Sequence, residues 1–269
     1  MGRTKSLFAA GAAGRLHLAD FGGAGPVLLA LHGVTGGSFL WAPLARELDG
    51  QVRVIALDFR GHGRSDWSQT GEYNTIDHVE DIAAVFAQVA FGPKPPCIIG
   101  SSWGALAAIG LLAGRPELAD GLIIVDVEPS FASSETDILP RPYSFAGMEA
   151  ALAWERKANP NAASADLSAF TEASLVETVE GTWLRRHDPF FLTRWPFRND
   201  DRWHELEGLR QNIHVVHGSD SFVRREICQR MAALRPGWGF TEIEQSGHLV
   251  PLEQPGALAS VVRAFLSIA

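Results

Sequence analysis

The sequence predicts an α/β fold in which a mostly parallel, doubly wound sheet is interrupted by a helical cap. Short apolar runs typical of strands alternate with longer runs of helical periodicity, as expected for βα units around a parallel sheet. The alternation stops in a middle stretch that is richer in Trp, Pro, Asn and Arg, and strand signals return near residue 213. We therefore expect a core formed by 1–129 and 211–269, and a cap formed by 130–210.

The expected strands are short apolar runs, which suit a sheet that is covered on both faces. They lie at 16–20, 27–31, 52–57, 97–99, 122–125, 213–217 and 240–244. Helical patterns lie between them at 39–48, 75–86 and 105–112. A terminal helix is expected to start at Pro255, because proline suits the first turn of a helix.

Composition limits the classes of function. The chain has 269 residues, of which 46% are hydrophobic and 20% are charged, so it can bury a large core. Its net charge of −8 and its lack of a lysine-rich stretch argue against nucleic acid as a partner. No apolar stretch approaches the ~20 residues that would cross a bilayer, so we expect no membrane partner and a cytoplasmic location.

The sequence also gives no sign of a metal or an organic cofactor. Its two cysteines, Cys97 and Cys228, are too few for a disulfide framework or a cysteine metal cluster, and both are expected to be small buried side chains. No dinucleotide-binding fingerprint is present. The expected partner is a small-molecule substrate, and the oligomeric state is not indicated.

The most informative motif is the pentapeptide Gly100-Ser101-Ser102-Trp103-Gly104. It follows the strand-like run 97–99 and opens a helix-like run, which is the setting of a nucleophile elbow. Ser102 would project from the turn between strand and helix. The free N–H groups at the helix start would favour the negative charge that develops during acyl transfer. The motif predicts a serine-dependent hydrolase.

A serine hydroxyl is a weak nucleophile until a base accepts its proton. Of the nine histidines, His248 is the best candidate, because it lies in a turn after the last expected strand and before the terminal helix. The backbone N–H groups of Val34 and Trp103 are the expected oxyanion donors, since Val34 follows the turn at Gly33 and Trp103 follows the nucleophile. His32, before that turn, is expected to be structural.

The acid that would orient His248 has two candidates. Asp126 closes the strand after the elbow helix, and Asp220 lies in the loop after the next core strand. Either carboxylate would lie at the C-terminal edge of the sheet and could accept a hydrogen bond from the imidazole. Aspartate is also common at strand ends as an ordinary turn residue, so the residues alone leave both candidates open.

Four segments together resemble the α/β-hydrolase family: 32–33, 58–66, 100–104 and 247–248. The resemblance covers nearly the whole chain outside the cap. The commonest pattern of that family would place the acid at Ser221, so Asp220 is one residue early. A subgroup of the family takes its acid from the end of the strand after the elbow helix, and the resemblance of this chain to that subgroup favours Asp126. Segment 58–66 is interpreted as a tight loop held by Arg–Asp pairs.

The cap is expected to select the substrate. Arg185, Arg186 and Trp183 are the candidate binding residues, because an arginine can hold a carboxylate bidentately while an aromatic side chain excludes water. The competing interpretation is a solvated face on which arginines pair with nearby aspartates. Arg141 and Arg156 are further candidates.

The expected reaction is hydrolysis of a small ester, lactone or amide through an acyl-enzyme, and a substrate that bears a carboxylate is a candidate. The alternatives are hydrolysis of a carbon–carbon bond in a ring-fission product, and a hydrolase-like ligand receptor without turnover, since function does not follow from fold.

Overall fold

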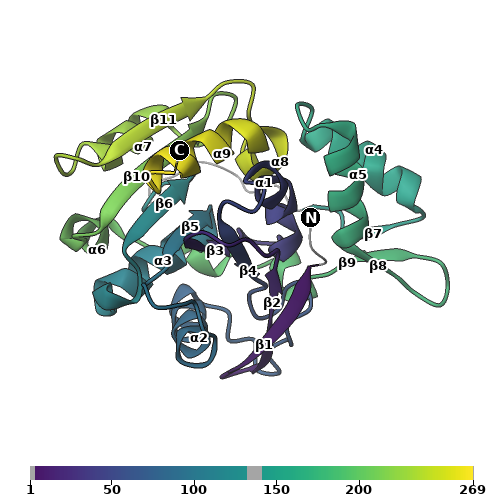
Figure 1. Cartoon of the computed structure of the whole chain (residues 1–269). Helices are drawn as coiled ribbons and strands as arrows, with labels where there is room; N and C mark the ends of the chain where they lie inside the picture. The colour runs from purple at the N-terminus through teal and green to yellow at the C-terminus, as the bar shows by residue number, and fades with distance from the viewer. Residues whose placement is uncertain (1–3, 132–140, 269) are drawn as a thin grey trace.

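A computed structural model describes residues 4–131 and 141–268 of the chain (Figure 1). Within these residues an eight-stranded sheet has the order β1-β2-β4-β3-β5-β6-β10-β11, and only the pairs β1-β2 and β2-β4 are antiparallel. The strands are β1 (Lys5–Gly11), β2 (Gly14–Asp20), β3 (Val27–Leu31), β4 (Arg53–Leu57), β5 (Cys97–Ser101), β6 (Gly121–Val125), β10 (Asn212–Gly218) and β11 (Gly239–Ile243). The expected α/β fold is confirmed, and β1 is an additional strand.

Helices cover both faces of this sheet (Figure 1). One buried cluster joins the sheet to α2 (Thr75–Gln88), α3 (Trp103–Gly114), α6 (Trp203–Gly208) and α7 (Arg225–Ala232). A second cluster joins the opposite face to α1 (Ala42–Glu47), α8 (Val250–Glu253) and α9 (Pro255–Phe265). The apolar α3 is buried along most of its length, which fixes the start of this helix, directly after Ser102, against the sheet.

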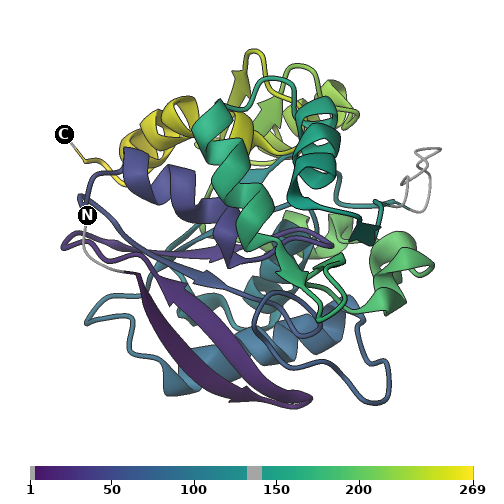
Figure 2. The ribbon, with the colours of Figure 1, turned by 90° about the vertical axis from the view of Figure 1, so that its right-hand side faces the viewer.

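An insertion lies between β6 and β10 and stands beside the main sheet (Figures 1 and 2). It contains α4 (Met148–Ala158), α5 (Ser164–Ala173) and short 3-10 helices at Pro189–Leu192 and Pro196–Asn199. It also contains a three-stranded antiparallel sheet, which the expectation of a helical cap did not include. Its strands are β7 (Ser144–Phe145), β8 (Leu175–Glu177) and β9 (Trp183–Arg185), in the order β7-β9-β8.

Segment 58–66 is held by buried ionic contacts to other elements. Arg60 and Asp81 of α2 form a buried two-bond pair, with Nε–Oδ2 and Nη2–Oδ1 distances of 2.6 and 2.7 Å. Asp58 accepts hydrogen bonds from the His17 ring, at 2.7 Å, and from the Ser38 backbone N–H, at 2.5 Å. The segment therefore joins β2, α2 and the loop after β3.

Several buried histidines make the stability of the fold depend on pH. Burial lowers the pKa of His187 to about 4, and it lowers the pKa of His62 and of His78 well below the ordinary value. The unfolded chain therefore binds more protons than the folded chain below about pH 6.5, so stability falls as the pH falls. The shift at His187 alone corresponds to about 3 kcal/mol between pH 7 and pH 4.

His78 offers a direct test, because neither of its ring nitrogens has a hydrogen-bond partner among the described residues. Leucine has a similar volume and needs no partner, so we expect His78→Leu to be neutral or stabilising at pH 7. Between pH 7 and pH 5 the variant should lose less stability than the wild type, by at most ~1.4 kcal/mol for each pH unit. Urea unfolding at both pH values measures this difference, and equal losses in the two proteins would contradict it.

Candidate active site

Ser102 lies in a strained turn between β5 and α3. Its backbone has φ 52° and ψ −125°, and its N–H donates to the carbonyl of Val125 at 2.9 Å. The glycines of the motif are needed for close packing. A Cβ on Gly100 would lie 2.5 Å from the Ala105 Cα, and a Cβ on Gly104 would collide with the carbonyl of Leu31. The two glycines give the turn its close packing, and the positive φ lies on the serine itself, as in a nucleophile elbow.

His248 and Asp126 are hydrogen-bonded, with a distance of 2.7 Å between Nδ1 and Oδ2. Asp126 is fully buried, and its carboxylate also accepts from the Gly218 N–H at 3.0 Å and the Ser221 hydroxyl at 2.5 Å. An imidazole that donates from Nδ1 to a carboxylate presents Nε2 as its acceptor. His248 and Ser102 line the same pocket.

The second candidate acid, Asp220, makes different contacts. Its carboxylate accepts from the Ser219 hydroxyl at 3.0 Å and the Asn161 side-chain amide at 3.4 Å, and no hydrogen bond joins it to His248 within the described chain. Ser221, where the commonest family pattern would place the acid, instead donates to Asp126. Sequence reasoning noticed this serine but not its role as a donor to the carboxylate.

An ion pair between a buried glutamate and a half-exposed arginine joins the loops that carry these residues. Glu128, two positions after Asp126, binds the guanidinium of Arg224 through two hydrogen bonds, at 2.8 Å from Nε and 2.5 Å from Nη2. Glu128 is buried, and Arg224 follows the loop of Ser221. The pair holds the ends of β6 and β10 together. The loop after β6 carries the Asp126 carboxylate, and the end of β10 and its loop carry the two donors to it, Gly218 and Ser221.

The loop after β3 approaches Ser102 closely. A Cβ on Gly33 would lie 2.9 Å from the Ser102 Cβ, so the approach requires glycine. The next residue, Val34, lines the pocket, and its N–H has no hydrogen-bond partner within residues 4–131 and 141–268. This N–H is therefore available as an oxyanion donor.

Two neutral histidines hold this loop in place. His32 donates from Nδ1 to the Gly33 carbonyl at 2.6 Å and accepts from the Phe59 N–H at 3.0 Å, which agrees with its expected structural role. His62 accepts from the Thr35 N–H at 3.1 Å, a role that sequence reasoning missed. Burial lowers the pKa of His32 and of His62, which keeps the nitrogens that accept these bonds unprotonated.

Trp103 begins α3, where the first N–H groups have no acceptor within the helix. Its backbone N–H can therefore serve as the second oxyanion donor. Its indole ring is fully buried, packs against Phe197 and His78, and donates from Nε1 to the Thr75 hydroxyl at 2.7 Å. The bulky side chain is thus housed in the core and does not obstruct the pocket.

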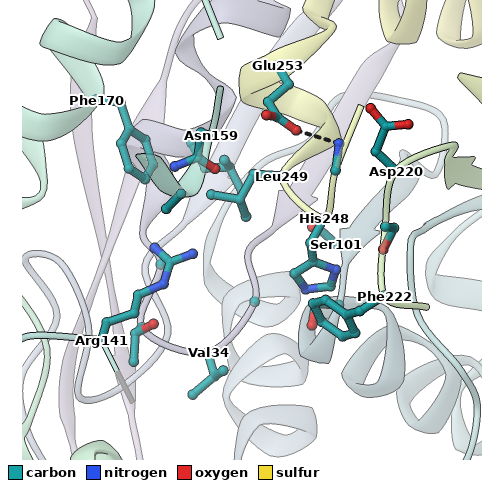
Figure 3. Close-up of a pocket in the computed structure, with 18 of the residues that line it drawn as sticks. Val34, Ser101, Arg141, Asn159, Phe170, Asp220, Phe222, His248, Leu249 and Glu253 are labelled. Carbon is teal, nitrogen blue, oxygen red and sulfur yellow. Dashed lines mark hydrogen bonds between the residues drawn. The ribbon is translucent and has the colours of Figure 1, made fainter. Parts of the chain in front are cut away.

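The pocket has a volume of about 600 Å³ and is lined by the core and the insertion together (Figure 3). Most of its wall is apolar, with Leu40, Phe131, Trp154, Phe170, Trp195, Phe197 and Leu249 among the lining residues. Among the described residues, the ionisable ones that line it besides His248 are Arg141, Asp220 and Glu253. Glu253 accepts from the Gly247 N–H at 2.5 Å and so helps to hold the turn that carries His248.

The three expected cap residues do not line this pocket. Arg185 is buried inside the insertion, where its Nη1 lies 2.8 Å from Oε1 of Glu155 in α4. Trp183 packs against the small apolar cluster of the insertion, and the backbone of Arg186 pairs with Ser174 and Gly63. Of the two further arginines that the sequence left open, Arg141 lines the pocket and Arg156 does not, within the described residues.

No group of three or more His, Cys, Asp or Glu side chains in residues 4–131 and 141–268 could hold a metal ion. None of the helices in the same residues is long and apolar enough to cross a membrane.

Comparisons with known proteins identify the family of the chain. A model of the alpha/beta hydrolase family matches residues 27–261, so the chain belongs to this family. The sequence is 28% identical to an esterase of Mycobacterium tuberculosis, Rv0045c, over 94% of this chain and 87% of the esterase. The crystal structure of that esterase superimposes with a TM-score of 0.80 at 26% identity, covering 99% of this chain and 92% of the esterase chain.

Two further relatives are informative. Lipase LipV of M. tuberculosis is 29% identical, over 93% of this chain and 97% of the lipase. A 2-(acetamidomethylene)succinate hydrolase of Mesorhizobium japonicum is 34% identical over 117 residues, which are 44% of this chain and 41% of that enzyme. A solved structure of this type of hydrolase has a TM-score of 0.85 at 21% identity, over 98% of this chain and all of that one, which shows a shared fold. The protein is a hydrolase.

Proposed function

We propose that the protein is a serine-dependent hydrolase that cleaves its substrate through an acyl-enzyme. The observation that carries the proposal is the hydrogen bond from His248 Nδ1 to the buried Asp126, made in the same pocket that Ser102 lines. This bond selects the tautomer whose Nε2 can accept a proton from a serine hydroxyl.

In the proposed reaction the Ser102 hydroxyl attacks the substrate carbonyl while His248 takes its proton. The N–H groups of Val34 and Trp103 stabilise the oxyanion, for which the loss of one donor typically costs ~2.7–4 kcal/mol. His248 then gives the proton to the leaving group, and the bond between carbonyl and leaving group breaks. A water molecule, deprotonated by His248, then attacks the acyl carbon. The bond to Ser102 breaks, the acid is released, and His248 returns the proton to the Ser102 oxygen.

The substrate class that we propose is a small ester, lactone or amide that bears a carboxylate. The pocket volume of about 600 Å³ suits a small molecule, and its largely apolar wall contains an arginine, Arg141. Such a charged group in an apolar wall can supply specificity for an anion. One relative is named as a hydrolase of 2-(acetamidomethylene)succinate, a compound that carries carboxylates.

A fluorophosphonate probe tests the proposed nucleophile. We expect stoichiometric labelling at Ser102, located by mass spectrometry, and the loss of both labelling and ester hydrolysis in Ser102→Ala. The matched control is Ser219→Ala, whose hydroxyl contacts only Asp220 in the structure and should leave labelling intact. Labelling elsewhere, or none in a folded protein, would contradict the proposal.

The same preparation discriminates the alternative functions. A receptor without turnover would bind small carboxylated esters and leave them intact. Release of products from a vinylogous diketone, with no activity on esters, lactones or amides, would instead indicate a carbon–carbon hydrolase.

A further inference from the structure

We propose that Arg141 binds a carboxylate on the acyl half of the substrate, so that the preferred substrates are monoesters or monoamides of short dicarboxylic acids. This inference rests on the proposed serine hydrolase, and it assigns the two halves of the substrate to opposite sides of the pocket.

Arg141 brings a positive charge to the pocket. It forms no ion pair with any carboxylate in residues 4–131 and 141–268, and its guanidinium lies 5.7 Å from the centre of the Trp154 ring. Burial lowers its pKa, because the surroundings disfavour an unpaired charge. A substrate carboxylate would supply the missing partner, through charge-assisted hydrogen bonds.

The neighbouring acidic side chain is engaged elsewhere. Glu155 of α4 lies 2.8 Å from Nη1 of Arg185, and its Oε2 accepts from the Asn159 side-chain amide at 3.0 Å. Arg185 also donates from Nε to the carbonyl of Pro142, at 2.8 Å. Pro142 is the residue directly after Arg141 in the chain. This buried pair therefore holds the backbone beside Arg141 in place, and no carboxylate of residues 4–131 and 141–268 forms an ion pair with the Arg141 guanidinium.

The chemistry determines which half of the substrate faces each wall. The leaving atom must receive its proton from His248, so the leaving group lies on the His248 side of the reacting carbon. The acyl chain must extend in another direction. In Figure 3, Arg141 and Val34 lie on one side of the pocket, and His248 and Phe222 lie on the other. The guanidinium is therefore placed for the acyl half.

The His248 side has features that suit an uncharged leaving group. Phe222 stacks on the His248 ring with 4.6 Å between the ring centres, and it is 53% exposed. Asp220 lines the pocket on the same side (Figure 3), where its negative charge would repel a carboxylate on the leaving group. The apolar ring and the nearby acid together favour a neutral, apolar alcohol or amine fragment there.

Three benzyl esters test this assignment. Monobenzyl succinate carries a carboxylate on the acyl half, benzyl butyrate carries none, and 4-carboxybenzyl butyrate carries one on the leaving half. From the value of hydrogen bonds to charged groups, we expect kcat/KM for monobenzyl succinate to exceed that for benzyl butyrate by about 10–100-fold. The third ester should be the poorest substrate. The released alcohol is quantified by chromatography.

Substitution of Arg141 connects the preference to this side chain. In Arg141→Met, the ratio of kcat/KM for monobenzyl succinate to kcat/KM for benzyl butyrate should fall by about 10–100-fold. Arg141→Lys should restore part of the preference, since it keeps the charge and loses the bidentate geometry. Arg156→Met is the matched control, because Arg156 lies in the same insertion and bonds Ala162 and Ser164, and none of these three residues lines the pocket.

The wild-type enzyme alone is sufficient to overturn the inference, whether or not the variants fold. Equal cleavage of monobenzyl succinate and benzyl butyrate, or a preference for 4-carboxybenzyl butyrate, would contradict it and leave the serine hydrolase standing. An equal loss for both substrates in a folded Arg141→Met would also contradict it. Absence of ester cleavage together with absence of probe labelling at Ser102 would instead refute the underlying hydrolase.

Discussion

Replacement of Asp126 by asparagine should lower kcat about 10⁴-fold. The asparagine amide would face Nδ1 of His248 with an N–H in place of the carboxylate oxygen that now lies 2.7 Å away. The imidazole would then favour the tautomer that carries its hydrogen on Nε2, and that nitrogen could no longer accept the proton of Ser102. The negative charge that stabilises the imidazolium would also be lost.

The fold should tolerate this replacement, because the Ser221 hydroxyl can rotate and the Gly218 N–H keeps an oxygen as acceptor. The matched control is Asp220→Asn, since Asp220 lines the same pocket without a bond to His248, and its kcat should change only a few-fold. Steady-state kinetics on one ester measures both. The reverse ranking would identify Asp220 as the acid and refute the triad that we propose.

Replacement of Asp81 by alanine should destabilise the fold by roughly 3–5 kcal/mol, as expected when one partner of a buried ion pair is removed. Arg60 and Asp81 are almost completely buried, at 2% and 1% side-chain exposure. Without the carboxylate, the Arg60 guanidinium would keep only its bonds to the Glu72 and Asp77 carbonyls. The uncompensated charge would remain in the core.

The adjacent residue of α2 provides the matched control. Glu80 pairs with Arg115 at 2.8 Å, but these side chains are 52% and 37% exposed. Exposed pairs contribute ~0–1 kcal/mol, so Glu80→Ala should change the free energy of unfolding by no more than that. Urea denaturation at pH 7 compares the two variants. Similar losses of stability would show that burial of the Arg60–Asp81 pair has little energetic effect.

Much of the fold could be predicted from the order of apolar runs, because buried parallel strands are the most apolar segments of the chain. The hairpin strand β1 was missed, since its residues are mostly exposed and Phe8 faces outward with 46% exposure. The small sheet of the insertion was missed because its strands have only two or three residues, too few to show a period of two.

The proposed catalytic residues could be named from the sequence because each follows a strand that the sequence also predicts. Ser102, Asp126 and His248 all lie at the carboxyl ends of core strands, which meet at one edge of a parallel sheet. The pocket lining contributed by the insertion could not be named in this way. The sequence favoured Arg185 over Arg141, but Arg185 is buried inside the insertion, where it pairs with Glu155 and donates to the Pro142 carbonyl.

The hydroxyl of Ser221 touches the carboxylate of Asp126 although the two side chains come from loops after different strands. If these two side chains exchanged positions in the chain, the negative charge would move by about the length of one hydrogen bond. A carboxylate on either loop would therefore present nearly the same electric field to the imidazole. The site fixes the point in space at which the negative charge is needed, and two chain positions in this protein reach that point.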